Sequence, residues 1–274
     1  MTAPPALRPE TGTGRCRQRS TGPGAPRMLL LHGLGSSPAA WDRYLAGGVP
    51  GYEVWDATLP WHGLAGSAWT RRCDPGRVVA DLANGRGTDA GQPFDVVVAH
   101  SYAAGLLLSA LAAGLLRIGA AVLVSPFYRA DPGSFDWPTI SAALNDFHLV
   151  FVEALRLSRI SRFPAGRQER LGRQLRNRVG PYGWMSFFQL YLDSPFLALD
   201  GVRTPVLVVR GDDDIASPLE DSRQLVRALP DARLARVAEC GHFPMVERPE
   251  QFALAVGGFL ASQKLAPHLK PELT

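Results

Sequence analysis

The chain has 274 residues, of which 46% are hydrophobic and 20% charged, so it can bury a sizeable core without disulfides or a structural metal. Its net charge of +4 does not indicate a nucleic-acid partner, because residues 1–27 hold five arginines and one glutamate and thus carry the whole excess. The three cysteines form no Cys-x-x-Cys pair, which excludes a zinc site of ordinary spacing and favours reduced thiols in a cytoplasmic protein.

The N-terminal segment 1–27 is rich in Pro, Gly, Thr and Arg and has no apolar region of the kind that a signal peptide requires. We expect it to be a disordered basic tail. No apolar run in the chain reaches the length of about 18 residues that a membrane span needs.

Short apolar runs alternate with helical stretches after this tail. Strands are predicted at 28–32, 52–58, 94–99, 120–125, 205–210 and 233–238, and helices at 38–46, 75–83, 101–116, 218–229 and 249–263. The near-continuous apolar runs FDVVVA and AAVLVS are typical of strands buried on both faces. The alternation predicts an α/β fold with a mostly parallel sheet of about six strands, flanked by helices.

The alternation is interrupted between residues 126 and 199, which hold no convincing buried strand but 13 of the chain's 24 aromatic residues. We therefore expect a helical cap, or lid, at 126–199. It would be inserted into a core formed by 28–125 and 200–266, with a short tail at 267–274.

The segment Val98–Gly105 reads V-A-H-S-Y-A-A-G, so a buried strand runs directly into Ser101 and a helix follows at once. This context suits a nucleophile elbow, a sharp turn that projects a serine from the end of a sheet. Ala99 and Ala103 stand where small residues are needed, although the usual residues there are glycines. A buried serine that caps the helix explains this segment equally well.

A second strand ends in a glycine turn at Leu29–Gly35, which reads L-L-L-H-G-L-G. This segment resembles the H-G-x-G turn of the α/β-hydrolase superfamily. The resemblance implies that the backbone N–H groups of Leu34 and Tyr102 form an oxyanion hole.

Two later segments resemble the same superfamily. V-R-G-D-D-D-I-A-S-P, at Val209–Pro218, is similar to its G-x-x-D-x-x-x-P segment and aligns Asp214 with the triad acid, with Asp212 and Asp213 as competitors. E-C-G-H-F-P-M-V-E-R-P-E-Q-F, at Glu239–Phe252, is similar to its G-H-x-x-x-x-E-x-P-x-x-F segment and aligns His242 with the catalytic base.

The order Ser101, Asp214, His242 matches the order of the triad in this fold. The resemblance covers about residues 28–265 and implies a serine hydrolase that forms an acyl-enzyme with an apolar ester, thioester or lactone. It implies no cofactor and no metal. Members of the superfamily usually begin with a strand hairpin, but residues 1–27 show no strand pattern, hence the expectation of only about six strands.

The substrate, a small acyl compound, is expected to contact bulky side chains near the nucleophile and in the cap. Trp61, in the segment L-P-W-H-G, replaces a small residue of a similar superfamily turn and is expected to narrow the entrance. The expected substrate-binding residues are His32, Trp61, Trp137, Phe147, Trp184 and Phe188.

Eight arginines lie between positions 156 and 178, with few acidic residues to oppose them. A solvated helix face is the simple interpretation. The alternative is a docking site for an anionic partner, such as an acyl carrier protein or a coenzyme A thioester.

Three other functions remain open. The chain could be a biosynthetic acyltransferase or cyclase, in which another group replaces water, or a carrier-protein thioesterase. It could also be a ligand-binding member of the superfamily without catalysis, for which the alanines beside Ser101 leave some room.

Overall fold

The structure, a computed structural model, describes residues 14–263 except 23, 64, 87–90 and 158–163. The expected C-terminal tail and residues 1–13 of the expected N-terminal tail lie outside the described residues. Among the described helices, none combines the length and the apolar character that crossing a membrane would require.

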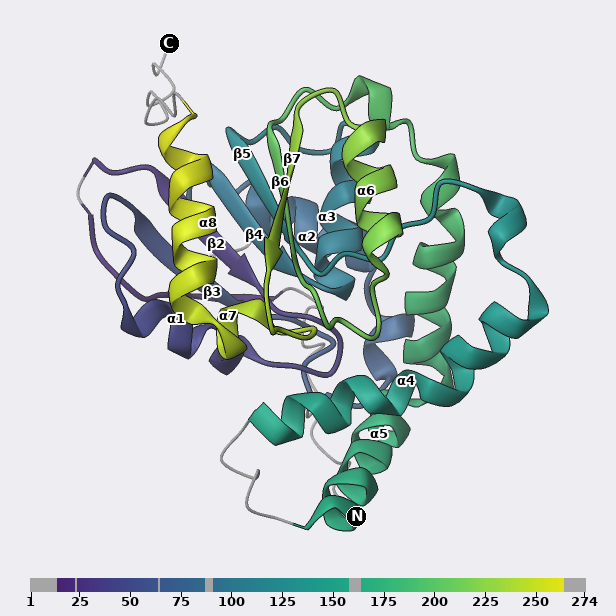
Figure 1. Cartoon of the computed structure of the whole chain (residues 1–274). Coiled ribbons are helices and arrows are strands. Elements are labelled where there is room, and N and C mark those ends of the chain that lie inside the picture. Colours follow the sequence, from purple (N-terminus) through teal and green to yellow (C-terminus); the bar gives the residue numbers. More distant parts are fainter. Residues whose placement is uncertain (1–13, 23, 64, 87–90, 158–163, 264–274) are drawn as a thin grey trace, which may run out of the picture.

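A single sheet of seven strands forms the centre of the molecule (Figure 1). Its strands in chain order are β1 (Arg15–Gln18), β2 (Arg27–Leu31), β3 (Glu53–Thr58), β4 (Val96–His100), β5 (Ala120–Val124), β6 (Val206–Gly211) and β7 (Ala232–Val237). Their order across the sheet is β1-β3-β2-β4-β5-β6-β7. All neighbouring pairs are parallel except β1 and β3, which confirms the predicted mostly parallel α/β architecture.

Helices cover both faces of this sheet, and the sheet separates two hydrophobic clusters. One cluster lies under α2 (Pro75–Ala83), α3 (Tyr102–Ala112) and α6 (Leu219–Ala228), and the other under α1 (Asp42–Ala46), α7 (Pro244–Glu247) and α8 (Pro249–Ala261). Residues 28–31 of strand β2 are all apolar because both faces of the strand are buried: Leu29 and Leu31 enter the first cluster, while Met28 and Leu30 enter the second.

Strand β1 lies within the segment that we expected to be a disordered tail, and it raises the strand number from about six to seven. It pairs antiparallel with β3, and two arginines bind Asp56 of that strand: Arg17 of β1 lies 2.9 Å from it, and Arg19, which follows β1, also binds it. Asp56 is only 1% exposed. Backbone pairing and these ion pairs, rather than an apolar pattern, therefore hold β1, which is why periodicity did not reveal it.

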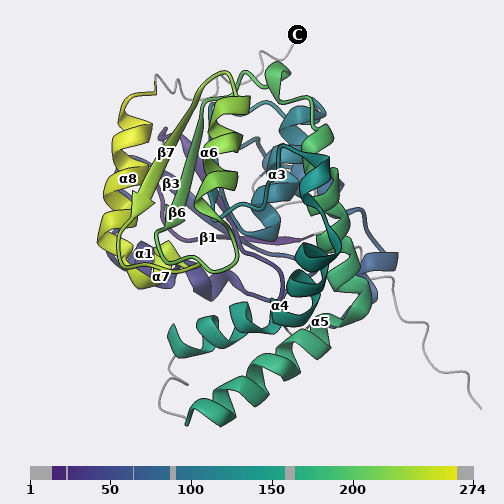
Figure 2. The same cartoon turned by 45° about the vertical axis from the view of Figure 1, so that its right-hand side comes forward.

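The expected helical insertion contains α4 (Trp137–Leu157) and α5 (Ala165–Asp193), which pack against each other beyond the end of the sheet to which the parallel strands point (Figure 2). Helix α5 is interrupted at Gly180, whose φ is 69°, and Pro181 follows. Proline cannot continue the hydrogen-bond pattern of the preceding turn, so the helix changes direction there.

We expect Asp56→Asn to lower the free energy of unfolding by about 1–3 kcal/mol, because a buried carboxylate that binds two arginines loses its charge. Urea denaturation of the variant and of Asp200→Asn, a substitution at an exposed aspartate, measures the difference. Equal stability of both variants would show that these ion pairs do not hold β1 in place.

Candidate active site

Ser101 lies in a strained turn between β4 and α3. Its φ of 56° and ψ of −119° are rare for a residue other than glycine and cost about 1–3 kcal/mol. Its backbone N–H donates to the Val124 carbonyl, 2.8 Å away, which holds the turn to the neighbouring strand β5. Ser101 occupies the N-cap position of α3, but its hydroxyl makes no capping hydrogen bond to this helix.

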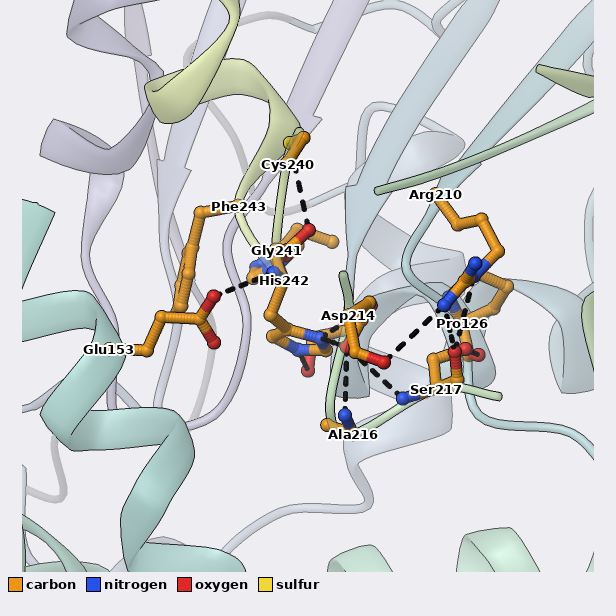
Figure 3. Close-up of polar contacts among 12 residues, drawn as sticks. Pro126, Glu153, Arg210, Asp214, Ala216, Ser217, Cys240, Gly241, His242 and Phe243 are labelled. Carbon is orange, nitrogen blue, oxygen red and sulfur yellow. Dashed lines mark hydrogen bonds and ion pairs between the residues drawn. The ribbon is translucent and has the colours of Figure 1, made fainter. Parts of the chain in front are cut away.

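Three side chains that are far apart in the sequence form one hydrogen-bonded chain. Nε2 of His242 lies 3.0 Å from Oγ of Ser101, and Nδ1 of the same ring lies 3.0 Å from both carboxylate oxygens of Asp214. Figure 3 shows Asp214 and His242 facing each other. The His242 side chain is fully buried, so water does not compete for these contacts.

The loop after β6 presents only one of its three consecutive aspartates to the imidazole. Asp212 forms an ion pair with Arg236 at 2.7 Å, and Asp213 is exposed. The Asp214 carboxylate accepts hydrogen bonds from the backbone N–H groups of Ala216 and Ser217 at 2.9 and 3.1 Å. Of the three aspartates, Asp214 is thus the one in contact with the His242 imidazole.

A buried arginine holds the loop that carries Asp214 in place. The guanidinium of Arg210 donates to the carbonyl of Ser217 at 2.9 Å and to that of Asp214 at 3.4 Å (Figure 3). The Ser217 hydroxyl in turn donates to the Pro126 carbonyl at 2.7 Å and does not cap α6. The loop is thus attached to the segment that follows β5.

The electrostatics favour an ionised acid and a basic imidazole. Burial acts to raise the pKa of Asp214, but the His242 charge, its hydrogen bond and the Ala216 N–H outweigh burial and lower this pKa to about 2. Burial acts to lower the pKa of His242, but Asp214 outweighs it, so the pKa is raised above its ordinary value, with Glu153 and Glu247 adding to the rise.

The two backbone amides expected to form an oxyanion hole belong to Leu34, which follows Gly33, and to Tyr102, which follows Ser101. Tyr102 is the first residue of α3, and within the described part of the chain neither its N–H nor that of Leu34 has a hydrogen-bond partner. Gly33 brings the Leu34 turn close to Ser101: a Cβ on Gly33 would lie 3.1 Å from the Ser101 Cβ and 3.0 Å from Nδ1 of His100. Free amides at such a turn are suited to bind a negatively charged oxygen.

His32, expected to contact substrate, has a different place in the structure. Its ring is fully buried, with Nδ1 donating to the Gly33 carbonyl at 2.9 Å and Nε2 accepting from the Leu59 N–H at 3.1 Å. Burial lowers the pKa of His32 to about 4, so the imidazole is neutral near pH 7. Both ring nitrogens are engaged in holding two turns together.

The expected aromatic pocket is only partly formed by the predicted residues. A cavity of about 500 Å³ lies beside the Asp214 loop, and Phe147 is the one predicted substrate residue among those that line it. Trp61 is buried against Tyr102, with ring centroids 5.3 Å apart, and does not line this cavity. Trp137 is 79% exposed. Trp184 stacks on Phe188, with ring centroids 4.7 Å apart, and neither residue lines this cavity.

The apolar walls of the cavity come mainly from other side chains. Phe127 and Ala216 connect it to the hydrogen-bonded chain, because the Phe127 ring lies 5.7 Å from that of His242 and Ala216 donates to Asp214. The bulky apolar lining residues are Phe127, Phe147, Leu149, Phe187, Tyr191 and Ile215.

Several residues around the site were missed at the level of sequence. Glu153 of α4 accepts a hydrogen bond from the His242 N–H, although in the sequence it stands out only as a rare acid among arginines. Glu247 belongs to the motif around His242, but the motif does not reveal that its carboxylate binds the N–H groups of Gly241 and Phe243. Within the described residues, no group of three or more His, Cys, Asp or Glu is placed to hold a metal ion.

Comparison with known proteins identifies the family. A sequence model described as "Alpha/beta hydrolase family" matches residues 28–256, and the chain therefore belongs to the α/β-hydrolase family.

Among characterised relatives, the chain is 28% identical over 260 residues to pimeloyl-[acyl-carrier protein] methyl ester esterase of Aromatoleum aromaticum, with 84% of this chain and 96% of that protein covered. It is 25% identical to the esterase of the same name from Nitrosomonas europaea, with 85% and 94% covered. The solved structure of Rv0554 from Mycobacterium tuberculosis is similar in fold, with a TM-score of 0.64, 20% identity, and 92% and 94% covered.

We expect Asp214→Asn to lower the pKa of the His242 imidazole, because the burial that disfavours the charged ring remains while the opposing carboxylate charge is lost. An NMR pH titration of the ring nitrogens measures this pKa. Asp212→Asn, which removes a carboxylate paired with Arg236, is the matched control and should leave the pKa of His242 unchanged. An equal fall in both variants would contradict the assignment of Asp214.

Proposed function

We propose that the chain is a serine hydrolase in which Ser101 is the nucleophile, His242 the base and Asp214 the acid that orients the histidine. The observation that carries this proposal is the continuous hydrogen-bonded chain Ser101–His242–Asp214, with distances of 3.0 Å at both junctions. The strained φ of Ser101 adds support, because such strain persists only where the surrounding structure imposes it.

The reaction proceeds through a covalent acyl-enzyme. Oγ of Ser101 attacks the carbonyl carbon and its proton passes to Nε2 of His242, while the free N–H groups of Leu34 and Tyr102 bind the oxyanion. The bond to the leaving oxygen or sulfur then breaks, and this group takes the proton from His242. Water attacks the acyl-enzyme with His242 as base, the bond to Oγ breaks, and the proton returns to Ser101.

The acyl part of the substrate occupies the aromatic cavity beside the Asp214 loop. The volume of about 500 Å³ and its walls of Phe127, Phe147 and Phe187 favour an extended apolar chain. Arg129 and Asp146 also line the cavity and add polar groups to it.

A fluorophosphonate probe should add once to the wild-type protein, and Ser101→Ala and His242→Ala should abolish the adduct, because each removes one partner of the proton transfer. Intact mass spectrometry measures it. Hydrolysis of a p-nitrophenyl ester should fall in the same variants by about 10⁴-fold or more, by analogy with triad residues. A folded wild-type protein that neither reacts with the probe nor cleaves esters would favour the ligand-binding alternative.

A more specific proposal is that the substrate is a methyl ester carried on an acyl carrier protein. The two esterases that align over most of this chain act, by their names, on such a substrate. Helix α5 supports this choice, because Arg167, Arg170 and Arg173 recur at intervals of three residues and are exposed. Carrier proteins of this kind are acidic, so a basic helix face would attract them. Arg159 and Arg162 lie outside the described residues.

Charge reversal on this face should therefore impair the carrier-bound substrate selectively. Arg170→Glu with Arg173→Glu is expected to lower kcat/KM for the carrier-bound methyl ester by at least about tenfold, through weaker electrostatic attraction. The free methyl ester should be unaffected, as should both substrates in Arg203→Glu, a change at an exposed loop arginine.

The products of the same assay separate the remaining functions. Methanol release with the acyl group still on the carrier indicates the methyl ester esterase. Release of the acyl group from the carrier indicates a thioesterase, and a product that retains an added acceptor indicates an acyltransferase. An equal loss for both substrates would contradict a carrier-docking role of α5.

A further inference from the structure

The backbone around His242 is held by two carboxylates from different parts of the fold. The N–H groups of Gly241 and Phe243 each donate to Glu247, both at 2.9 Å, and the His242 N–H between them donates to Oε1 of Glu153 at 3.1 Å. Glu247 belongs to α7, next to this loop, whereas Glu153 belongs to α4 of the helical insertion (Figure 3). Three consecutive amides are thus bound, and the middle one depends on the insertion.

Gly241 makes the close approach of Glu153 possible. A Cβ at this position would overlap Oε1 of Glu153 and would lie 3.3 Å from Oε1 of Glu247. A side chain on residue 241 would therefore push the carboxylate of α4 away from the His242 amide.

Other contacts fix α4 in the position that this hydrogen bond requires. Val150, Ala154 and Leu157 of α4 pack against the hydrophobic cluster that contains Phe243. Arg43 of α1 donates to the Leu157 carbonyl at 3.0 Å and to the Val246 carbonyl at 2.9 Å, and so joins the end of α4 to α7.

The second carboxylate oxygen of Glu153, Oε2, is buried and makes no hydrogen bond within the described part of the chain. Burial raises the pKa of this carboxyl, the His242 N–H and the His242 charge act to lower it, and the charges of Glu247 and Asp214 raise it further. A buried, incompletely bonded carboxylate is costly, and here it is kept beside the reacting histidine.

Three carboxylates from different elements act on the charge of His242. Asp214, Glu153 and Glu247 all raise its pKa, from the β6–α6 loop, α4 and α7. His100, at the end of β4, donates its Nε2–H to the His242 carbonyl at 2.9 Å, and burial lowers the pKa of His100 to about 3, so that ring is neutral. Arg43 binds the carbonyls of Leu157 in α4 and Val246 in α7.

We propose that Glu153 is a positioning residue through which α4 holds the backbone of His242 for reaction with Ser101 and places a negative charge near the imidazole. This inference rests on the proposed hydrolase function. It makes the basicity of His242 depend on the position of the insertion, because displacement of α4 removes both the hydrogen bond and the charge.

Glu153→Gln tests the charge separately from the hydrogen bond, since the amide oxygen still accepts from the His242 N–H. A smaller negative potential at the imidazole should lower the pKa of His242. The acidic limb of the pH profile should therefore move to lower pH, for both kcat/KM on a p-nitrophenyl ester and the rate of fluorophosphonate labelling. The variant would then retain a larger fraction of its maximal rate in acid than the wild-type protein.

Two further variants complete the experiment. Glu169→Gln, at an exposed carboxylate of α5, should leave the acidic limb unchanged. Glu153→Ala removes the hydrogen bond as well as the charge, and should lower kcat by about 10- to 100-fold through misplacement of the imidazole.

The outcomes distinguish this inference from the function on which it rests. A wild-type protein without labelling or ester hydrolysis would overturn the proposed function, and the role of Glu153 with it. An active wild-type protein whose acidic limb does not move in Glu153→Gln would overturn the role of Glu153 alone.

Discussion

The backbone of Ser101 adopts a conformation that costs a residue with a side chain about 1–3 kcal/mol, and the surrounding structure must supply that energy. The parallel strands β4 and β5 do so from one side, through the bond from the Ser101 N–H to Val124. Helix α3 does so from the other, with Ala103 fully buried. The hydrogen bond between His242 and Ser101 depends on this turn, because the turn holds the Ser101 hydroxyl in one position.

Much of the core followed from local sequence patterns. Strands buried on both faces have continuous apolar runs. Ser101, Asp214 and His242 were predicted to act together because their segments resemble those of the α/β-hydrolase superfamily. The prediction was incomplete where pairing depends on long-range charge. Strand β1 is such a case, because Asp56 binds Arg17 and Arg19 across two strands and no periodicity marks this contact. The choice among three adjacent aspartates likewise needed the loop geometry.

The insertion was harder to predict because aromatic residues serve there both as core and as cavity walls. Composition located the cluster correctly, but the direction of each ring depends on the helix face and on the break at Gly180. Phe147 faces the cavity, whereas Trp137 on the same helix points to solvent. Glu153 is a similar case, since only the packing of α4 turns this carboxylate toward the histidine loop.

The break in α5 also separates two tasks within one helix. Before Gly180, the helix lies against α4, with Gly172 so close to Val152 that a side chain there would clash. After Pro181, it rests on the core, where Leu190 meets Gly105 of α3. The second half also supplies Phe187 and Tyr191 to the cavity wall, whereas the first half exposes Arg167, Arg170 and Arg173. In evolutionary terms, the break lets the exposed surface of the first half diverge without moving the cavity wall or the contact with α3.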